Sequence, residues 1–182
     1  MPMPTVAVLV GSLRAQSLNR RYAHALARLA EGTLEMRFCE IGDLPLYNED
    51  LWADPPVPVL RMKQEVQAAD AVMLITPEYN RGTTPAMVNA LDWGSRPMGE
   101  SCWPDKPAAI SGISPGAPGT LGAQKELRER ATVLGMQVMG LPQVYMQASE
   151  GLMQDDRIIE ASAIDFLGGW LTKFAGFVEK HR

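Results

Sequence analysis

The stretch "VAVLVGSLRAQSLNRRYAHALARLA", Val6–Ala30, contains both kinds of element from which the fold is built. It begins with the apolar run Val6–Val10, which stops at Gly11. A short continuous run of this kind predicts a strand that is buried on both faces of a sheet. The next apolar residues recur every three or four positions, as in a helix: Leu18, Tyr22, Leu26 and Leu29. The stretch therefore predicts a strand, a loop over 11–18 and a helix.

The same alternation continues along the rest of the chain. Apolar runs predict further strands at 34–41, 71–76, 107–111 and within 143–148. Helical spacing or capping residues predict helices over 59–69, from Thr84-Pro85 onward, over 122–134 and over 164–178. Alternating strands and helices are typical of a parallel sheet covered by helices on both faces. We therefore expect one α/β domain over residues 1–182 with a five-stranded parallel sheet.

The first thirty residues have an unusual charge. The chain carries 17 Lys and Arg and 21 Asp and Glu, for a net charge of −4, yet no acidic residue precedes Glu31. Four arginines do precede it: Arg14, Arg20, Arg21 and Arg28. A helix N-terminus carries partial positive charge and favours an anion, so three arginines near that end are unfavourable. We expect a bound anion to supply the missing negative charge.

Three loops leave the carboxyl ends of predicted strands, where open α/β sheets bind their ligands. The first, 11–18, leads directly into a helix and offers groups that bind anions: Gly11, Ser12, Arg14, Ser17 and, just beyond it, Asn19. It contains neither Gly-Lys-Ser/Thr nor G-x-G-x-x-G, so it is not a P-loop or a dinucleotide fingerprint. The alternative is an ordinary capped helix with arginines exposed to solvent.

The other two loops could contact a planar ring. Loop 76–84 places Tyr79 and Asn80 between Pro77 and Gly82, with a plain surface turn as the alternative. Glu78 lacks a second titratable group in reach, which argues against a general acid. Loop 111–122 contains four glycines stiffened by two prolines. Close approach of its backbone to a ligand is favoured over a flexible linker.

Composition excludes several classes of function. An isoelectric point near 5.2 provides no basic field for nucleic acid. No apolar run approaches the length of a membrane span or a signal peptide. Cys39 and Cys102 are too few and too far apart to indicate a disulfide framework, which favours a cytoplasmic protein with reduced thiols. Neither His24 nor His181 has metal-ligand spacing to another residue, so no metal is expected.

Two tryptophans point to an interface between subunits. Trp93 and Trp103 lie in a Gly- and Pro-rich context. We interpret them as anchors of a subunit contact, because tryptophan is enriched at interfaces.

Three motifs, in this order, resemble one known family: "GSLRAQSLNR", "TPEYNRGTTPAMVNALDW" and "SGISPGAPGTLGAQ". They are similar to those of the NADPH-dependent FMN reductases, which have a flavodoxin-like fold and include chromate, quinone and azo-dye reductases. The resemblance covers nearly the whole chain. It implies FMN as bound cofactor, NADPH or NADH as electron donor, and a homodimer or homotetramer with subunit contacts near Asp92 and Trp93.

The resemblance also assigns roles by position. It implies that the FMN phosphate is held by the first loop and that the flavin ring lies against the second and third loops. The residues implied for FMN are Gly11, Ser12, Arg14, Ser17, Leu18, Asn19, Pro77, Glu78, Tyr79, Asn80, Ser111 and Gly112. No catalytic side chain is implied, because a flavin carries the redox chemistry itself.

We therefore expect an NAD(P)H oxidoreductase that passes electrons through FMN to a flavin, quinone, azo compound or metal oxyanion. The main alternative is a flavodoxin-like electron carrier with no substrate of its own. Such a carrier is expected to lack the loop arginine and to have a more acidic surface, and both features count against it. A third possibility is a binding module of the same fold that holds no flavin.

Overall fold

The computed structural model describes residues 2–182, which contain a sheet of six parallel strands. The strands are β1 (Thr5–Val10), β2 (Glu35–Cys39), β3 (Ala71–Ile75), β4 (Pro107–Ser114), β5 (Gln137–Val138) and β6 (Val144–Gln147). Their order is β2-β1-β3-β4, with β5 and β6 both paired to β4. This is the flavodoxin-like order. The five predicted strand positions are confirmed, the last of them as β6, and the two-residue strand β5 was not predicted.

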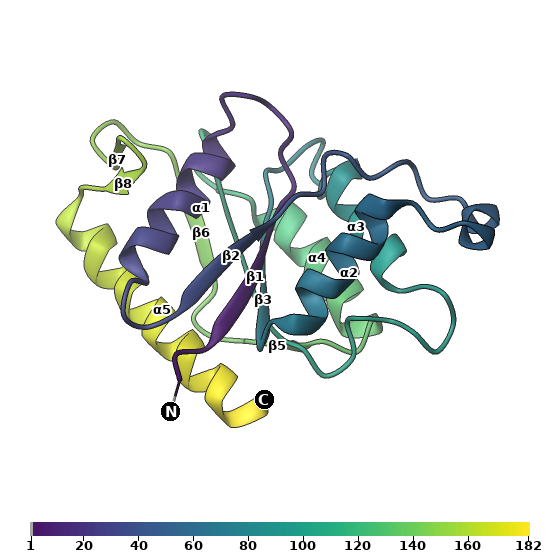
Figure 1. The fold of residues 1–182 in the computed structure, drawn as a ribbon. Coiled ribbons are helices and arrows are strands. Elements are labelled where there is room, and N and C mark those ends of the chain that lie inside the picture. Colours follow the sequence, from purple (N-terminus) through teal and green to yellow (C-terminus); the bar gives the residue numbers. More distant parts are fainter. Residues whose placement is uncertain (1) are drawn as a thin grey trace.

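Five α-helices cover the two faces of the sheet (Figure 1). They are α1 (Leu18–Leu29), α2 (Val57–Ala68), α3 (Pro85–Gly94), α4 (Leu121–Val133) and α5 (Ala161–His181). Helices α1 and α5 lie on one face, and α2, α3 and α4 lie on the other. A short 3-10 helix spans Glu49–Ala53. No helix among the described residues is long and apolar enough to cross a lipid bilayer.

Strand β1 separates two hydrophobic cores. Val6, Val8 and Val10 pack against the face that α1 and α5 cover, whereas Ala7 and Leu9 pack against the opposite face. Because alternate side chains of a strand point to opposite faces, a strand at the centre of such a sheet must be apolar at every position. This explains the continuous apolar run from which the strand was predicted.

Two parts of the chain differ from the predicted elements. Strand β4 continues past Ser111 to Ser114, because residues 111–114 pair with β6, so Gly112 lies in a strand and not in a loop. A hairpin formed by β7 (Met153–Gln154) and β8 (Arg157–Ile158) was not predicted. Its tip is Asp155-Asp156, with positive φ angles of 46° and 53°. This two-residue turn suits a tight hairpin.

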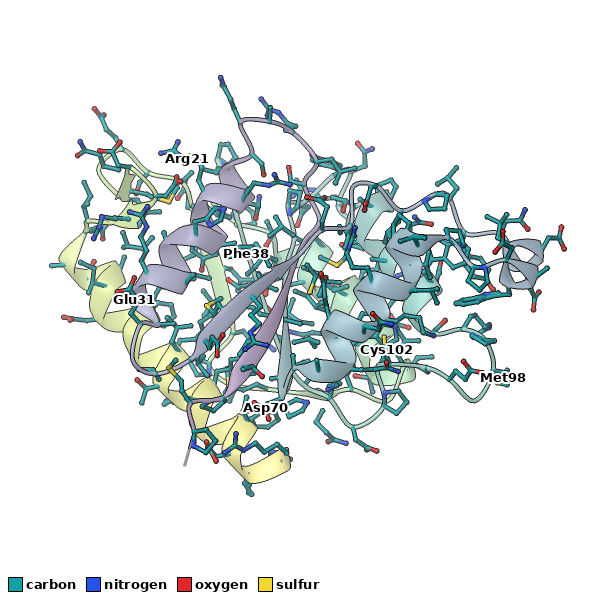
Figure 2. All side chains as sticks on the ribbon, viewed as in Figure 1. Arg21, Glu31, Phe38, Asp70, Met98 and Cys102 are labelled. Carbon is teal, nitrogen blue, oxygen red and sulfur yellow. The ribbon has the colours of Figure 1, made fainter. Side chains whose placement is uncertain are left out.

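The arginines near the start of the chain are mostly paired within the protein. Arg21 Nε donates to Asp156 Oδ1 at 3.0 Å, and Figure 2 shows Arg21 beside the hairpin. Arg28 donates to the Asp155 carbonyl at 3.2 Å, and Arg20 lies 3.7 Å from a carboxylate oxygen of Glu40. Acidic residues distant in the sequence therefore face two of the four arginines, Arg20 and Arg21, and the expected anion is needed mainly at Arg14.

The two tryptophans predicted at an interface are buried inside the subunit. Trp93 and Trp103 have no exposed surface. The indole N–H of Trp93 donates to the Pro45 carbonyl at 2.7 Å, and that of Trp103 donates to the Leu91 carbonyl at 2.9 Å. Each ring therefore has an internal hydrogen-bond partner and an apolar environment, so neither indole is available as an interface anchor.

Asp70 forms hydrogen bonds to Thr5, the first residue of β1, at the amino end of the sheet. Its Oδ2 accepts hydrogen bonds from the Thr5 backbone N–H at 2.8 Å and the Thr5 hydroxyl at 3.0 Å. Burial by itself would raise the pKa of Asp70, but the bonds from Thr5, with Arg182 and Lys106 nearby, lower it below the ordinary value of 3.8. The folded state therefore stabilises the charged form of the Asp70 carboxylate relative to the unfolded state.

We predict that Asp70→Ala lowers the free energy of unfolding by about 1–2 kcal/mol at pH 7, because two hydrogen bonds to a charged group are lost. The contribution is fully present above pH 3.8 and is lost as the pH falls through the lower pKa of the folded state. Denaturant unfolding at pH 7 and pH 3 measures both effects. Asp165→Ala, at an exposed position on α5, is the control and should change stability little. An equal loss for both variants would contradict this role of Asp70.

Candidate cofactor site

A cavity of about 440 Å³ opens where β1 and β3 end. This is the point at which the strand order reverses, because β2 lies on one side of β1 and β3 on the other. Open α/β sheets bind ligands at such a point. The cavity is lined by Gly11, Leu13, Arg14, Tyr79, Thr84, Pro85 and Ala86. Its walls are mostly apolar, and its volume is in the usual range for a small-molecule site.

A buried hydrogen bond joins the first two predicted loops at this cavity. The Thr84 hydroxyl donates to the Gly11 carbonyl at 2.7 Å, and it accepts from the Met87 N–H at 3.3 Å as the cap of α3. A side chain at position 11 would place its Cβ 2.7 Å from Thr84 Oγ1. Gly11 is therefore required for close approach of the two segments.

Arg14 is exposed at the cavity, and its side chain forms no hydrogen bond or ion pair with the rest of residues 2–182. The neighbouring N-terminus of α1 is capped by Ser17, whose hydroxyl accepts from the Arg20 N–H at 3.1 Å. No acidic residue lies in the first turn of α1. The N–H groups of Leu18 and Asn19 precede the first intrahelical hydrogen bond, so they lack helical acceptors. A cation and a positive helix end thus lie together.

The other polar residues predicted around the first loop, Ser12, Ser17 and Asn19, are buried. Ser12 is only 4% exposed, and Asn19 is 3% exposed. The Asn19 amide donates to the Ile113 carbonyl at 2.9 Å and accepts from the Ile113 N–H at 3.0 Å. This side chain ties α1 to β4, so its observed contacts position the loop.

The second loop forms a tight turn at the edge of the cavity. Tyr79 and Gly82 exchange backbone hydrogen bonds of 3.0 Å in both directions. Between them Asn80 and Arg81 have positive φ angles of 52° and 67°. Tyr79 lines the cavity with 45% of its surface exposed, whereas Pro77 is buried behind it. The turn therefore presents the Tyr79 ring to any ligand in the cavity.

The Glu78 carboxylate is hydrogen-bonded to the N-terminus of helix α4. Its Oε2 accepts from the N–H groups of Gly122 at 2.7 Å and Ala123 at 3.2 Å, at the N-terminus of α4. Its Oε1 lies 3.1 Å from the Arg81 guanidinium. A carboxylate at a helix N-terminus is favourable. These contacts support the view that Glu78 is not a general acid and show that it links the second loop to α4.

The predicted third-loop residues are packed against protein. The Ser111 side chain is fully buried, with Oγ 3.0 Å from the Tyr22 hydroxyl and 3.3 Å from the Val144 carbonyl. A Cβ on Gly112 would overlap the Thr76 carbonyl oxygen and lie 2.5 Å from Thr120 Oγ1. The close approach that requires a glycine here is therefore to the protein's own backbone.

Both thiols are unsuited to nucleophilic chemistry. Burial raises the pKa of Cys39 to about 12 and that of Cys102 to about 11. A thiol with such a pKa remains protonated at neutral pH, and the thiolate is the reactive form.

Of the residues predicted from the sequence, Gly11, Arg14 and Tyr79 line the cavity. The other predicted residues lie in the segments around it. The sequence reasoning missed four lining residues: Leu13, Thr84, Pro85 and Ala86. A signal for two of them was available, because Thr84-Pro85 predicted the start of a helix directly after a ligand-binding loop. Helices that follow strands begin at the same edge of the sheet as the ligand site.

The fold and the cavity define a flavodoxin-like protein with an arginine, unpaired within the described residues, at an apolar cleft. The sequence matches the NADPH-dependent FMN reductase family over residues 4–151. It is 42% identical to a quinone reductase from Pseudomonas putida, over 98% of this chain and 96% of the relative. It is 40% identical to a 2-hydroxy-1,4-benzoquinone reductase from a Burkholderia species, over 97% of both chains. The chain belongs to the NADPH-dependent FMN reductase family, and its cofactors are FMN and NAD(P)H.

The fold agrees closely with that of a solved flavoenzyme. The NAD(P)H:(acceptor) oxidoreductase FerB from Paracoccus denitrificans has a TM-score of 0.96 and 44% identity, over 98% of this chain and 99% of FerB. The agreement extends through the whole architecture, so the predicted flavodoxin-like fold and the predicted family are both confirmed.

We predict that Gly112→Ala lowers the free energy of unfolding by at least about 2 kcal/mol, because the added methyl group overlaps the end of β3 and cannot be accommodated without moving backbone. The matched control is Gly116→Ala, where the nearest atoms lie 3.8 Å from the new Cβ. That change should stay within about 0.5 kcal/mol. Thermal or denaturant unfolding of both variants compares them, and equal stability would refute the tight packing at Gly112.

Proposed function

We propose that this protein holds FMN in the β1–β3 cavity and uses NAD(P)H to reduce a quinone. The observation that carries the proposal is an exposed arginine without a protein partner among residues 2–182, in a cavity with mostly apolar walls and three residues before the cap of α1. The names of the Pseudomonas and Burkholderia relatives support a quinone as the acceptor. Flavins, azo compounds and metal oxyanions remain further candidates for the same site.

Three helices begin around the cavity, and only one suits the phosphate of FMN. The N-terminus of α4 is already occupied by the Glu78 carboxylate. Helix α3 begins with Pro85, which has no N–H to donate, and is capped by Thr84. Helix α1 has no acidic residue in its first turn and begins beside Arg14. Arg14 and the first N–H groups of α1 would therefore hold the phosphate, since anions bind at such helix ends.

The remaining walls fit a flat aromatic ring. Leu13, Pro85, Ala86 and the Tyr79 ring supply apolar surface, and Leu13 remains 53% exposed. FMN held there would supply the hydride and electron-transfer chemistry that links the nicotinamide to the acceptor. Apart from Arg14 and Tyr79, no titratable side chain lines the cavity. We infer that the chain binds and orients the reactants, and that solvent at the open mouth supplies the protons.

An electron carrier without its own substrate is not favoured. Belonging to a reductase family argues against it, as does the cation at the cavity. Stopped-flow measurement of flavin bleaching by NADPH separates the two functions. A reductase reacts on the time scale of turnover, whereas a carrier reacts very slowly.

We also propose a cytoplasmic homodimer or homotetramer. Both cysteines are free and buried, which suits a reducing compartment. The buried tryptophans no longer support association, but a groove of about 390 Å³ between α3 and α4 is available. It contains Leu91 and Leu134 beside Val133, which is 81% exposed. Asp92, Glu126, Glu129 and Arg130 line the same groove, so a second copy bound there would have to match charged as well as apolar groups.

Self-association predicts a solution mass well above the monomer value of 19.9 kDa. Light scattering of the flavin-loaded protein at micromolar concentration measures it. Val133→Asp should shift the mass toward the monomer, because a charge at the groove opposes apolar contact. A monomer mass for the unmodified protein would exclude the proposed assembly.

We predict that Arg14→Ala weakens FMN binding about tenfold. Hydrogen bonds to charged groups contribute about 1.5–3 kcal/mol, and an exposed site takes the lower part of that range. Affinity for riboflavin, which lacks the phosphate, should hardly change. Fluorescence titration with both flavins provides the contrast.

Arg20→Ala is the matched control, because Arg20 lies on the first turn of α1 but faces Glu40. It should leave the affinity for both flavins within about twofold. If Arg14→Ala reduced riboflavin and FMN affinity equally, Arg14 would not be a phosphate ligand.

A further inference from the structure

Helix α4 is attached to both sides of the Tyr79–Gly82 turn. Before the turn, the Glu78 carboxylate accepts from the N–H groups at the start of α4, at 2.7 Å and 3.2 Å. After the turn, Thr83 N–H donates to Oε2 of Glu126, which lies on α4, at 2.8 Å. One carboxylate reaches from the loop to the helix and the other from the helix to the loop. We call these two contacts the carboxylate clamp.

Glu126 lies directly against the turn. A Cβ on Gly82 would be 2.7 Å from Glu126 Oε2, so the carboxylate occupies the space that a side chain would need. The other carboxylate oxygen, Oε1, lies 2.8 Å from Nη2 of Arg130. The hydrogen bond from Thr83 lowers the pKa of Glu126, burial opposes the shift, and Arg130 adds to it. Glu126 is therefore charged at neutral pH, and each of its oxygens has a partner.

The clamp is connected to the cavity through two adjacent threonines. Thr83 Oγ1 lies 2.9 Å from Thr76 Oγ1, which closes the base of the loop. The next residue, Thr84, lines the cavity and donates to the Gly11 carbonyl at 2.7 Å. Fixing the Thr83 backbone from α4 thus fixes the segment between the Tyr79 ring and the start of α3.

We propose that Glu126 is a positioning residue for the ring-binding side of the cofactor cavity. The inference rests on the proposed function, because it assigns the flavin ring to the Tyr79 wall. Glu126 does not line the cavity, so it acts only through Thr83 and the turn. Arg14 lies on the first loop, apart from the clamp. Loss of Glu126 therefore affects the ring-binding wall and leaves the phosphate contact intact.

This arrangement gives a distinct binding signature. Glu126→Ala should weaken FMN and riboflavin equally, by about tenfold, since a charge-assisted hydrogen bond that orders the turn is lost. Arg14→Ala should weaken FMN alone. In the double variant the two losses for FMN should multiply, because the residues act on different parts of the ligand.

Two controls on α4 separate the clamp from a general effect on the helix. Glu129→Ala removes an exposed carboxylate that has no side-chain hydrogen bond among residues 2–182. Arg130→Ala removes the ion pair to Glu126 and leaves the Thr83 contact in place. Both controls should bind FMN and riboflavin within about twofold of the unmodified protein.

A conservative variant guards against loss of folding. Glu126→Gln keeps an oxygen that can accept from the Thr83 N–H, so it should recover most of the flavin affinity. Hydrogen exchange at the Thr83 amide provides a readout besides binding. Exchange should be faster in Glu126→Ala than in Glu126→Gln and in the Glu129→Ala control.

The outcomes distinguish failure of the positioning role of Glu126 from failure of the proposed function. Equal tenfold losses for both flavins, with both controls unaffected, support the positioning role. Unchanged flavin affinity in Glu126→Ala, a loss confined to FMN, or an equal loss in Arg130→Ala overturns it. If the unmodified protein bound neither flavin, the proposed function itself would fail and the inference with it.

Discussion

The hydrogen bond from the Thr84 hydroxyl to the Gly11 carbonyl is the contact on which the site depends. It joins the loop after β1 to the segment after β3, at the place in the sheet where the strand order reverses. The bond forms only because position 11 has no side chain. Arg14 and Tyr79 lie on the two segments that this bond joins and line the same cavity. The geometry of the site therefore depends on how closely the backbone at Gly11 approaches Thr84.

The fold could be predicted because its elements depend on local patterns. The run Val6–Val10 is apolar at every position because the strand is covered on both faces. Thr84 caps α3 and Pro85 follows it, as their sequence indicates. Arg14 was found for a similar reason, because a loop arginine before a helix without acidic residues is visible in one short segment.

The contacts that could not be predicted join residues far apart in the sequence. Arg21 and Asp156 are separated by 135 positions, and Glu78 and Gly122 by 44, so neither pairing has a local signal. The prediction from composition that Trp93 anchors a subunit contact was wrong, because Trp93 is packed in the core despite its Gly- and Pro-rich sequence surroundings. Gly112 was expected to let the loop approach a ligand, but the group that a side chain there would meet is the protein's own Thr76 carbonyl, just after β3.

The tip of the Tyr79 turn limits how this site can change during evolution. Asn80 and Arg81 have left-handed backbone angles, which asparagine, aspartate and glycine adopt at low cost and β-branched residues do not. A substitution at either position must therefore be compatible with a positive φ angle, whatever its effect on the acceptor. Tyr79 and Leu13 have no such restriction and are partly exposed. We therefore expect sequence differences that alter acceptor preference among related reductases to occur at Tyr79 and Leu13. Positions 80 and 81 should vary only among residues that adopt left-handed backbone angles.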